Sequence, residues 1–182
     1  MNLTIRVVPH RELTRGDLAG LRTLFDAEYL DEFGDWNPEE PYGYAPHDAH
    51  VMASRGDVTV GHVGWARRSI GVGERNVVIA GVGGVLVAET ARGLRLGEQL
   101  MRTAVASMRD AGDIEFGYLG CREEVVPFYQ FCGWRRVAAV ERSLNRAGVP
   151  SIDPPGQPLL VLPLDSTLRW PDGDIDLRGR AW

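Results

Sequence analysis

The chain has 182 residues, 44% of them hydrophobic, and its 20 basic and 25 acidic side chains give a net charge of −5. This length predicts one domain with a substantial core, and the acidic balance argues against general nucleic-acid binding, which requires a cationic surface. The sequence has neither a run of about 18 apolar residues nor a signal-like N-terminus, so we expect a cytoplasmic protein that does not enter a membrane. Two cysteines, Cys121 and Cys132, are too few for a disulfide framework or a zinc site of Cys pairs, and we expect no metal.

The first elements are predicted from hydrophobic spacing. Alternation over residues 3–8 predicts a strand, and apolar residues at helical spacing over 18–29 predict a helix capped by Thr14. Prolines and aromatic residues are concentrated in the substrate-side loop, residues 33–48, a composition typical of a loop over a binding site.

Strands are predicted in the middle of the chain. Residues 50–54 and 58–67 form a predicted hairpin, and a third strand is expected over 76–87. Glycines near the centre of that third strand indicate a bulge or a close backbone approach: Gly81, Gly83 and Gly84.

The second half predicts a mixture of helices and strands. Amphipathic spacing predicts a helix over 96–108, followed by a short strand over 114–119 and a short helix over 123–132. Strands are expected around 134–144 and 159–164, with a Pro- and Gly-rich loop between them. The C-terminal tail, residues 166–182, is expected to be irregular.

The stretch RGLRLG, residues 92–97, lies where a predicted strand gives way to a helix. Such a turn directs backbone N–H groups and the positive end of the helix to one point. Gly93 and Gly97 remove side chains there, and Arg92 and Arg95 add positive charge. The stretch therefore predicts a phosphate or pyrophosphate site.

The order of strand, RGLRLG, amphipathic helix, short strand and FYQFCGW (residues 128–134) resembles the GNAT superfamily of N-acetyltransferases. The resemblance implies a single α/β (α+β) domain over residues 1–182, with a mixed central sheet of about six to seven strands flanked by helices. It also implies acetyl-CoA as cosubstrate. The residues that would bind it are Val85, Leu86 and Val87 at the pantetheine arm, and Arg92, Gly93, Leu94, Arg95, Leu96 and Gly97 at the pyrophosphate. Arg95 stands where the superfamily motif has its first Gly.

Within this superfamily, most of residues 50–182 resemble the aminoglycoside 2'-N-acetyltransferases. The resemblance rests on Arg95, on Tyr129 followed by Gly133 and Trp134, on VLPLD from Val161, and on the ending DLRGRAW. It implies acetylation of a cationic amino sugar, a role in antibiotic resistance and a homodimer. A weaker resemblance to the nodulation N-acyltransferases, which transfer long acyl chains to a chitin-like amine, ranks second. Another small amine as acceptor and a catalytically silent CoA-binding domain stay open as alternatives.

The resemblance assigns catalytic roles to two residues. The backbone N–H near Val85 would bind the thioester oxygen, and Tyr129 would protonate the leaving thiolate; a core aromatic is the alternative role for Tyr129. Gly83 stands where related enzymes carry a catalytic Glu, so the base is missing. We expect an amine that is partly neutral unaided, assisted by Asp35 and Glu39. A backbone carbonyl with ordered water and the Trp182 carboxylate are the other candidates.

Candidate acceptor-binding residues come from the loop, the strand ends and the tail: Asp35, Trp36, Glu39, Gly120, Cys121, Asp153, Arg180 and Trp182. Trp36, Tyr42 and Tyr44 either stack on a sugar or pack the loop. Arg180 suits an acceptor that carries a carboxylate as well as an amine. His47 and His50 are expected at a polar loop edge, and His62 as a core or surface ring. Cys121 has no partnered His in the sequence pattern, so direct transfer is expected over a covalent acyl-Cys intermediate.

Overall fold

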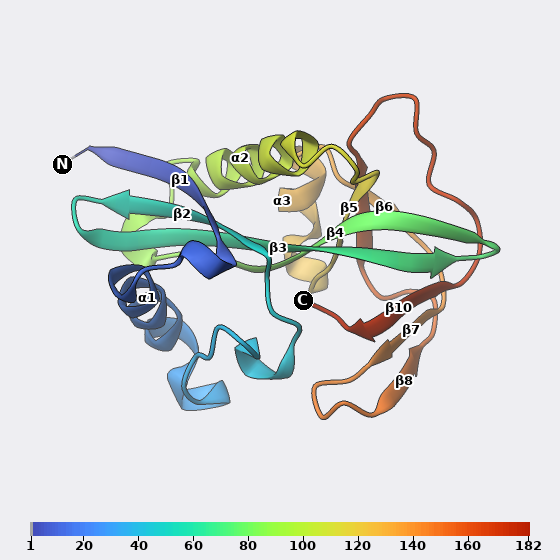
Figure 1. The fold of residues 1–182 in the computed structure, drawn as a ribbon, viewed down its shortest axis with the longest axis horizontal. Helices are drawn as coiled ribbons and strands as arrows, with labels where there is room; N and C mark the ends of the chain where they lie inside the picture. Colours follow the sequence, from blue (N-terminus) through green and yellow to red (C-terminus); the bar gives the residue numbers. More distant parts are fainter. Residues whose placement is uncertain (1) are drawn as a thin grey trace.

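The computed structural model describes residues 2–182, which form one mixed, curled sheet of ten strands flanked by helices (Figure 1). The strands are β1 (Leu3–Pro9), β2 (Ala49–Arg55), β3 (Val58–Val72), β4 (Arg75–Val87), β5 (Phe116–Gly120), β6 (Arg135–Val137), β7 (Glu141–Leu144), β8 (Pro150–Asp153), β9 (Leu159–Pro163) and β10 (Ile175–Arg180). The helices are α1 (Arg15–Phe33), α2 (Leu96–Asp110) and α3 (Val126–Phe131), with short 3-10 turns at His10–Glu12, Pro41–Gly43, Glu89–Ala91 and Glu123–Val125.

The strands are ordered β6-β9-β5-β4-β3-β10-β7-β8, and β1 and β2 extend the sheet from the first half of β3. Among the strands within residues 2–182, only the β4–β5 and β10–β7 pairs are parallel. This confirms the predicted α+β class and the mixed sheet, although the sheet has more strands than the six or seven expected.

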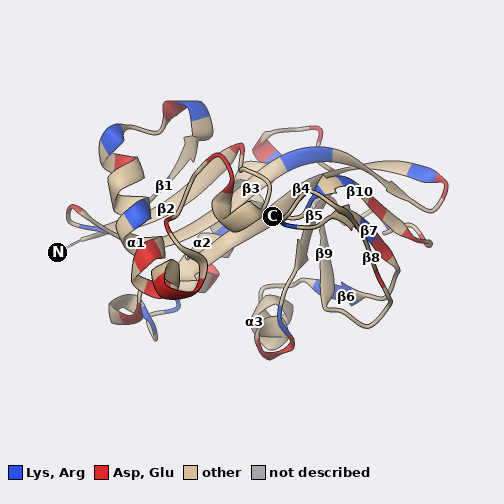
Figure 2. Ribbon diagram, turned by 90° about the horizontal axis from the view of Figure 1, so that it is seen from below, with Lys and Arg blue, Asp and Glu red and all other residues tan. Residues whose placement is uncertain are grey.

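Helix α1 begins and ends where its sequence predicts. The side chain of Thr14 accepts a hydrogen bond from the N–H of Asp17, and the Asp17 carboxylate accepts one from the N–H of Thr14, so two free N–H groups are satisfied. Gly34 ends the helix at a φ of 78°. Its apolar side buries Leu21 and Phe25 against the sheet, while acidic side chains gather at its C-terminal end and in the following loop (Figure 2).

The predicted bulge in β4 is confirmed. Leu86 pairs with His62 and Gly83 pairs with Gly64, so Gly84 and Val85 together face one residue of β3. Gly84 adopts a φ of 58°, a left-handed conformation that favours glycine.

Strands β4 and β5 separate before the bulge of β4 is reached. Their parallel pairing runs from Ile79 and Phe116 to Gly81 and Tyr118 and goes no further. The remainder of β4, which carries the bulge, therefore has no strand partner on its β5 side, and a space opens between the two strands.

The strands expected around residues 134–144 are present, and two other predictions about the C-terminal half were wrong. Residues 134–144 form two strands, β6 and β7, which lie in distant parts of the sheet. Strand β8 lies in the segment expected to be a loop, and the tail contains β10, which pairs with both β3 and β7. Ile175 and Leu177 of β10 are fully buried, so an alternating pattern within the polar tail provides the core contact.

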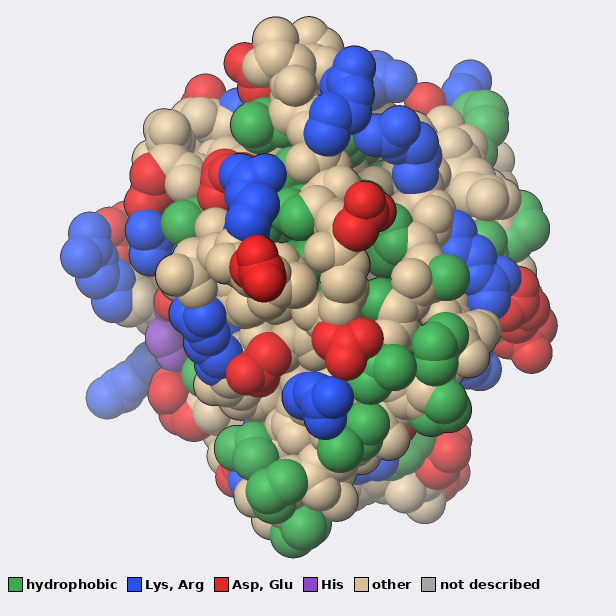
Figure 3. All heavy atoms as spheres, turned by 90° about the vertical axis from the view of Figure 1, so that its right-hand side faces the viewer, with side chains coloured by type: hydrophobic (Ala, Val, Ile, Leu, Met, Phe, Trp, Pro, Cys, Tyr) green, Lys and Arg blue, Asp and Glu red, His purple; other side chains and the backbone are tan. Residues whose placement is uncertain are grey.

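Basic and acidic side chains are interspersed on the face that carries the β3–β4 turn and the β10 side of the sheet (Figure 3). Within residues 2–182, no helix combines the length and the apolar composition needed to cross a bilayer.

Candidate active site

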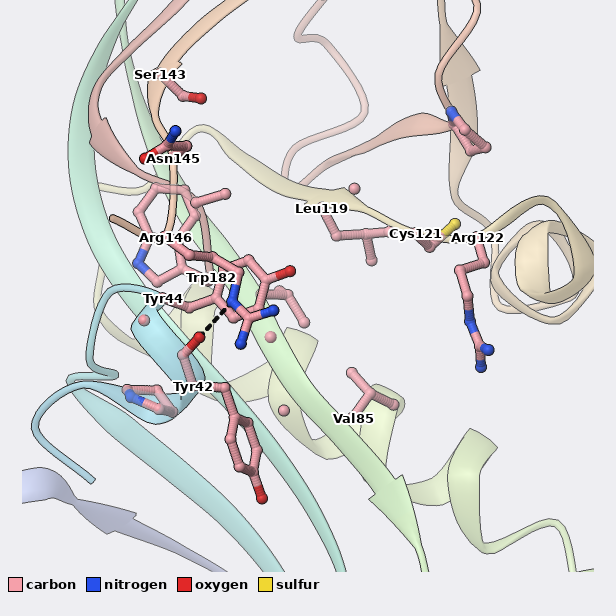
Figure 4. Close-up of a pocket in the computed structure, with 18 of the residues that line it drawn as sticks. Tyr42, Tyr44, Val85, Leu119, Cys121, Arg122, Ser143, Asn145, Arg146 and Trp182 are labelled. Carbon is pink, nitrogen blue, oxygen red and sulfur yellow. Dashed lines mark hydrogen bonds between the residues drawn. The ribbon is translucent and has the colours of Figure 1, made fainter. Parts of the chain in front are cut away.

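A cavity of about 830 Å³ lies where β4 and β5 separate. Figure 4 shows Val85 on β4 facing Leu119 on β5 and Cys121 just after β5 across this space, with Tyr44, Arg146 and Trp182 on the side away from Cys121. The walls come from α1, the loop after it, β7, β8 and the end of the tail.

The backbone of β4 presents free groups to this cavity. The N–H of Ala88 donates to the carbonyl of Val60 on β3 at 2.9 Å, so the strand alternation turns the N–H and C=O groups of Val85 and Val87 away from β3. Arg92 Nε donates to the Val87 carbonyl at 3.2 Å, which agrees with this direction. Leu86 differs from its neighbours because its side chain is buried in the core beneath α1 and does not line this cavity.

The turn at residues 92–97 borders a smaller cavity of about 410 Å³ next to Val87, Phe128 and Phe131. Arg95 adopts a φ of 55°, in the left-handed region that favours glycine. This backbone conformation explains why the superfamily motif has Gly at this position. Gly93 also has a positive φ, and a Cβ there would meet nothing within 4 Å. Gly97 has a packing role, because a Cβ there would lie 3.2 Å from the Phe128 ring.

Carboxylates already neutralise the two arginines of the turn. Arg92 pairs with Glu28 at 2.9 Å, and Arg95 pairs with Glu98 at 2.7 Å. The first N–H groups of α2, which begins at Leu96, have no acceptor within the helix. An anion here would therefore be held mainly by the helix N-terminus and the turn backbone, with the arginines in a secondary role.

Tyr129 lies on α3 and lines the large cavity, although its side chain is almost buried. Burial raises its pKa well above the ordinary phenol value, with further increases from Cys121 and Cys132 nearby. Among residues 2–182 its hydroxyl has no hydrogen-bond partner, so it is free to contact a ligand. The higher pKa makes proton donation to a thiolate more costly than in an exposed phenol.

The end of the tail covers the sheet position where the catalytic Glu is missing. A Cβ on Gly83 would lie 2.4 Å from the main-chain carbonyl carbon of Trp182, and a Cβ on Gly81 would lie 2.0 Å from the indole ring. Arg68 stacks on the other side of that ring, 3.9 Å from its centroid. A side chain larger than glycine at either of these two positions would therefore collide with Trp182.

Most of the acidic side chains at the end of α1 and in the following loop, Glu32, Asp35, Glu39 and Glu40, do not line the cavity. Asp35 is exposed and lies outside it, and Glu39 pairs with His10 at 2.8 Å. Arg180 also lies outside the cavity and forms an ion pair with Glu40. Glu32 is the member of this group that does line it.

The sequence-based interpretation missed a polar wall formed by β7 and β8. Glu141 pairs in register with Asp153, and its buried carboxylate accepts a hydrogen bond from the Tyr118 hydroxyl. Burial raises the pKa of Glu141, an effect that the Tyr118 hydrogen bond opposes and Asp153 reinforces. The wall also includes Ser143, Asn145, Ser151 and Gln157. The sequence signal for this wall was Glu141 itself, a single acidic residue directly after the apolar run AAV.

Five of the expected acceptor-binding residues do line the cavity: Trp36, Gly120, Cys121, Asp153 and Trp182. Burial raises the pKa of the Cys121 thiol, so it is not poised as a thiolate nucleophile. Trp36 stacks on Phe25 with ring centroids 5.2 Å apart and is 2% exposed, so it mainly packs the loop. Tyr44 is 39% exposed and keeps a free surface toward the cavity.

The expectation of a polar loop edge at the histidines was wrong. His47 and His50 are buried, as is His62 on β3. Burial lowers the pKa of all three, and the neighbouring histidines lower those of His47 and His50 further. In the described residues, no group of three or more His, Cys, Asp or Glu side chains is arranged to hold a metal ion.

Comparison with known proteins decides the family. The model of the family described as Nodulation protein A (NodA) matches residues 1–180. The chain belongs to the nodulation protein A family. Nodulation protein A of Azorhizobium caulinodans is 29% identical over 193 residues, which cover 97% of this chain and 84% of that protein. The nodulation resemblance, which the sequence motifs ranked second, is therefore the one that the family model matches.

Solved structures establish the GNAT fold. Escherichia coli ElaA superposes with a TM-score of 0.63 at 21% identity over 88% of this chain and 99% of that chain. E. coli YhbS, a GNAT family N-acetyltransferase in complex with CoA, gives 0.63 at 16% identity over 96% and 89%. An aminoglycoside 6'-N-acetyltransferase complexed with CoA gives 0.58 at 17% identity over 92% and 99%. With its family, this fold makes the chain an N-acyltransferase.

Proposed function

We propose that this chain transfers an acyl group from a CoA-type thioester to the primary amine of an amino sugar. The observation that carries the proposal is the cavity between β4 and β5, which has free backbone groups on one side and paired carboxylates on another. The family favours a chitin-like amine as acceptor, and an aminoglycoside is the second candidate because the same carboxylates suit any polycationic sugar. A homodimer is proposed by resemblance to the superfamily.

The donor side of the site is formed by backbone. The N-terminus of α2 and the turn 92–97 would bind the pyrophosphate, and the outward-facing groups of Val85 and Val87 would bind the pantetheine arm. The Val85 N–H would then stabilise the oxyanion that forms as the amine attacks the thioester carbon. The C–N bond forms, the C–S bond breaks, and the thiolate takes a proton from Tyr129.

The acceptor side is formed by side chains of β5, β7 and β8. Glu141 and Asp153 would hold the ammonium form of the acceptor, while Ser143 and Asn145 offer partners for sugar hydroxyls. Because Asp35 and Glu39 lie outside the cavity, Glu141 replaces them as the carboxylate that assists loss of the amine proton. Its raised pKa suits this role.

An aromatic wall from α1 and its following loop borders the Val85 end of the cavity. Tyr42 packs edge-on against Tyr29 and at a tilt against Phe33, and Phe25 stacks on Trp36. Such a wall favours an acyl group larger than acetyl, because apolar surface gains from covering a hydrocarbon chain. This agrees with the long acyl chains that the nodulation resemblance implies.

A panel of donors and acceptors tests the proposal. Acetyl-, octanoyl- and palmitoyl-CoA are each mixed with chitosan oligomers, an aminoglycoside and a simple alkyl amine. Thiol release gives the rate, and mass spectrometry identifies the product. Release above background only with amino sugars, and faster with the longer acyl groups, would support the proposal.

Glu141→Gln tests the acceptor wall. We expect the acceptor KM to rise about 10-fold, because a charge-assisted contact is lost, while the Kd for CoA stays unchanged. Glu74→Gln is the matched control, since Glu74 lies exposed in the β3–β4 turn. Absence of thiol release with every pair, despite CoA binding, would instead establish a catalytically silent CoA-binding domain.

A further inference from the structure

Three histidine side chains form a continuous hydrogen-bonded line from the loop after α1 to the bulge of β4. Nδ1 of His10 lies 3.0 Å from Nε2 of His50, and Nδ1 of His50 lies 2.9 Å from Nε2 of His62. At the inner end, Nδ1 of His62 lies 2.7 Å from the carbonyl oxygen of Gly84. At the outer end, Nε2 of His10 lies 2.8 Å from a carboxylate oxygen of Glu39.

The two end acceptors determine which nitrogens at the ends of the line carry hydrogen. A carbonyl and a carboxylate only accept hydrogen bonds, so both terminal ring nitrogens carry hydrogen. With neutral rings at His62 and His50, each of these two donates from Nδ1 and accepts at Nε2, and both nitrogens of His10 face acceptors. Burial lowers the pKa of His50 to about 3 and that of His62 to about 4, which agrees with neutral inner rings. Wherever the remaining protons lie, Nδ1 of His62 faces a carbonyl oxygen and is therefore the donor of that contact.

The inner end of the line acts on one peptide unit of the bulge. The C=O of Gly84 and the N–H of Val85 belong to the same trans peptide, so they point in opposite directions. His62 lies on β3 and draws the carbonyl toward that strand. The Val85 N–H must then point away from β3, into the space between β4 and β5.

We propose that His62 is a positioning residue for acyl transfer, which holds and polarises the Gly84–Val85 peptide so that the Val85 N–H is aligned with the thioester oxygen. The inference rests on the proposed function. A hydrogen bond donated to a peptide carbonyl strengthens the N–H of the same peptide as a donor. His50 and His10 hold the His62 ring in the tautomer that can donate.

The local packing fits this role. The bulge removes the Gly84 carbonyl from the regular pairing with β3, and an unpartnered carbonyl in the core would be costly. A Cβ on Gly84 would lie 3.1 Å from Nδ1 of His62 and 3.3 Å from the Phe25 ring, so the residue has room for little more than its backbone. Phe25 packs edge-on against the His62 ring and keeps water away from this contact.

Three substitutions at His62 distinguish the effect of losing the Nδ1–H donor from the effect of losing the imidazole ring. Asn places its amide nitrogen close to the position of Nδ1, Gln places it close to that of Nε2, and Leu has no donor. We expect His62→Leu and His62→Gln to lower kcat about 10-fold or more, since loss of an oriented oxyanion donor has effects of this size or larger. His62→Asn is expected to recover most of that loss, and the Kd for CoA is expected to change less than about twofold in all three.

A stability control and a spectroscopic readout accompany the kinetics. Leu21→Ala removes a fully buried side chain from the same core region, so it is expected to lower Tm while kcat is unchanged. Long-range 1H–15N NMR spectra are expected to show Nδ1–H tautomers for His50 and His62 and two protonated nitrogens for His10. The Val85 amide proton is expected to move upfield in His62→Leu and to return in His62→Asn.

Folded His62→Leu protein with kcat within about twofold of the wild type would overturn the inference, as would equal loss in His62→Leu and His62→Asn. If the wild type releases thiol from no donor, the proposed function fails on its own. The NMR experiment then still decides the line, because a His62 ring protonated at Nε2 alone, or an unshifted Val85 amide, contradicts the positioning role.

Discussion

Mild acid is expected to destabilise this protein strongly, because three of its histidines are buried as neutral rings. Burial lowers the pKa of His50 to about 3, that of His62 to about 4 and that of His47 well below its usual 6.5. In the unfolded chain each ring binds a proton near pH 6.5. The stability that these groups contribute is therefore complete above pH 6.5 and is lost as the pH falls toward the folded values.

The expected size follows from the difference in protonation. At pH 5, protonation of each ring in the unfolded chain favours unfolding by about 2 kcal/mol. One pKa unit corresponds to about 1.4 kcal/mol, and pH 5 lies about 1.5 units below 6.5. Three rings together give about 6 kcal/mol, a large part of the roughly 5–15 kcal/mol that stabilises a typical domain. Glu141 opposes this in part, because its raised pKa gives a contribution that is present at low pH and declines as the pH rises.

Urea unfolding followed by tryptophan fluorescence, at intervals from pH 7.5 to 5, measures this effect. The free energy of unfolding is expected to fall with a slope that approaches three protons, about 4 kcal/mol per pH unit, near pH 5.5. His47→Gln removes one titrating ring that packs against His50 and His62 but forms no hydrogen bond in the line from His10 to Gly84, so its slope should be smaller by about one proton. A free energy that changes by less than about 1 kcal/mol over this range would refute the assignment of neutral buried rings.

Two substitutions test the turn before α2. Gly97→Val is expected to raise the Kd for CoA, measured by calorimetry, about 10-fold, because the added side chain meets Phe128 beside the helix N-terminus. Gly16→Ala at the start of α1 is the control, and its Kd for CoA should be unchanged. Arg95→Gly is expected to raise the free energy of unfolding by about 1 kcal/mol, since Arg95 has a φ of 55°, in the left-handed region. Its Kd for CoA is expected to change less than about threefold, because Glu98 already neutralises the Arg95 charge. A large loss of CoA binding in Arg95→Gly would show that the arginine charge, and not the backbone, binds the pyrophosphate.

Local signals were sufficient for the first half of the fold. The Thr14 cap, the spacing of apolar residues in α1 and the bulge near Gly84 all depend on residues close in sequence, and each was predicted correctly. The C-terminal half depends on contacts with distant strands. Strand β10 is stable because Ile175 and Leu177 fill a core between β3 and β7, which no local propensity encodes.

The same distinction holds for the site. The turn at 92–97 and the position of Tyr129 could be inferred because a motif carries them, and Arg95 departs from that motif only in its side chain. Glu141 could not be inferred, since its role depends on Tyr118 from β5 and on pairing with Asp153. Asp35 and Glu39 gave the opposite error, because both were expected to bind the acceptor, yet Asp35 is exposed outside the cavity and Glu39 pairs with His10.

The glycines of β4 show why a correct local prediction still left the site incomplete. Their spacing indicated a close approach but not its partner, and the structure gives each a different one. Gly81 lies under the indole of Trp182, Gly83 lies under its main chain, and Gly84 lies against His62 and Phe25. Packing of the tail therefore explains why position 83 is Gly and not Glu. A glutamate side chain there would displace Trp182. Any proton acceptor must therefore come from a different wall of the cavity.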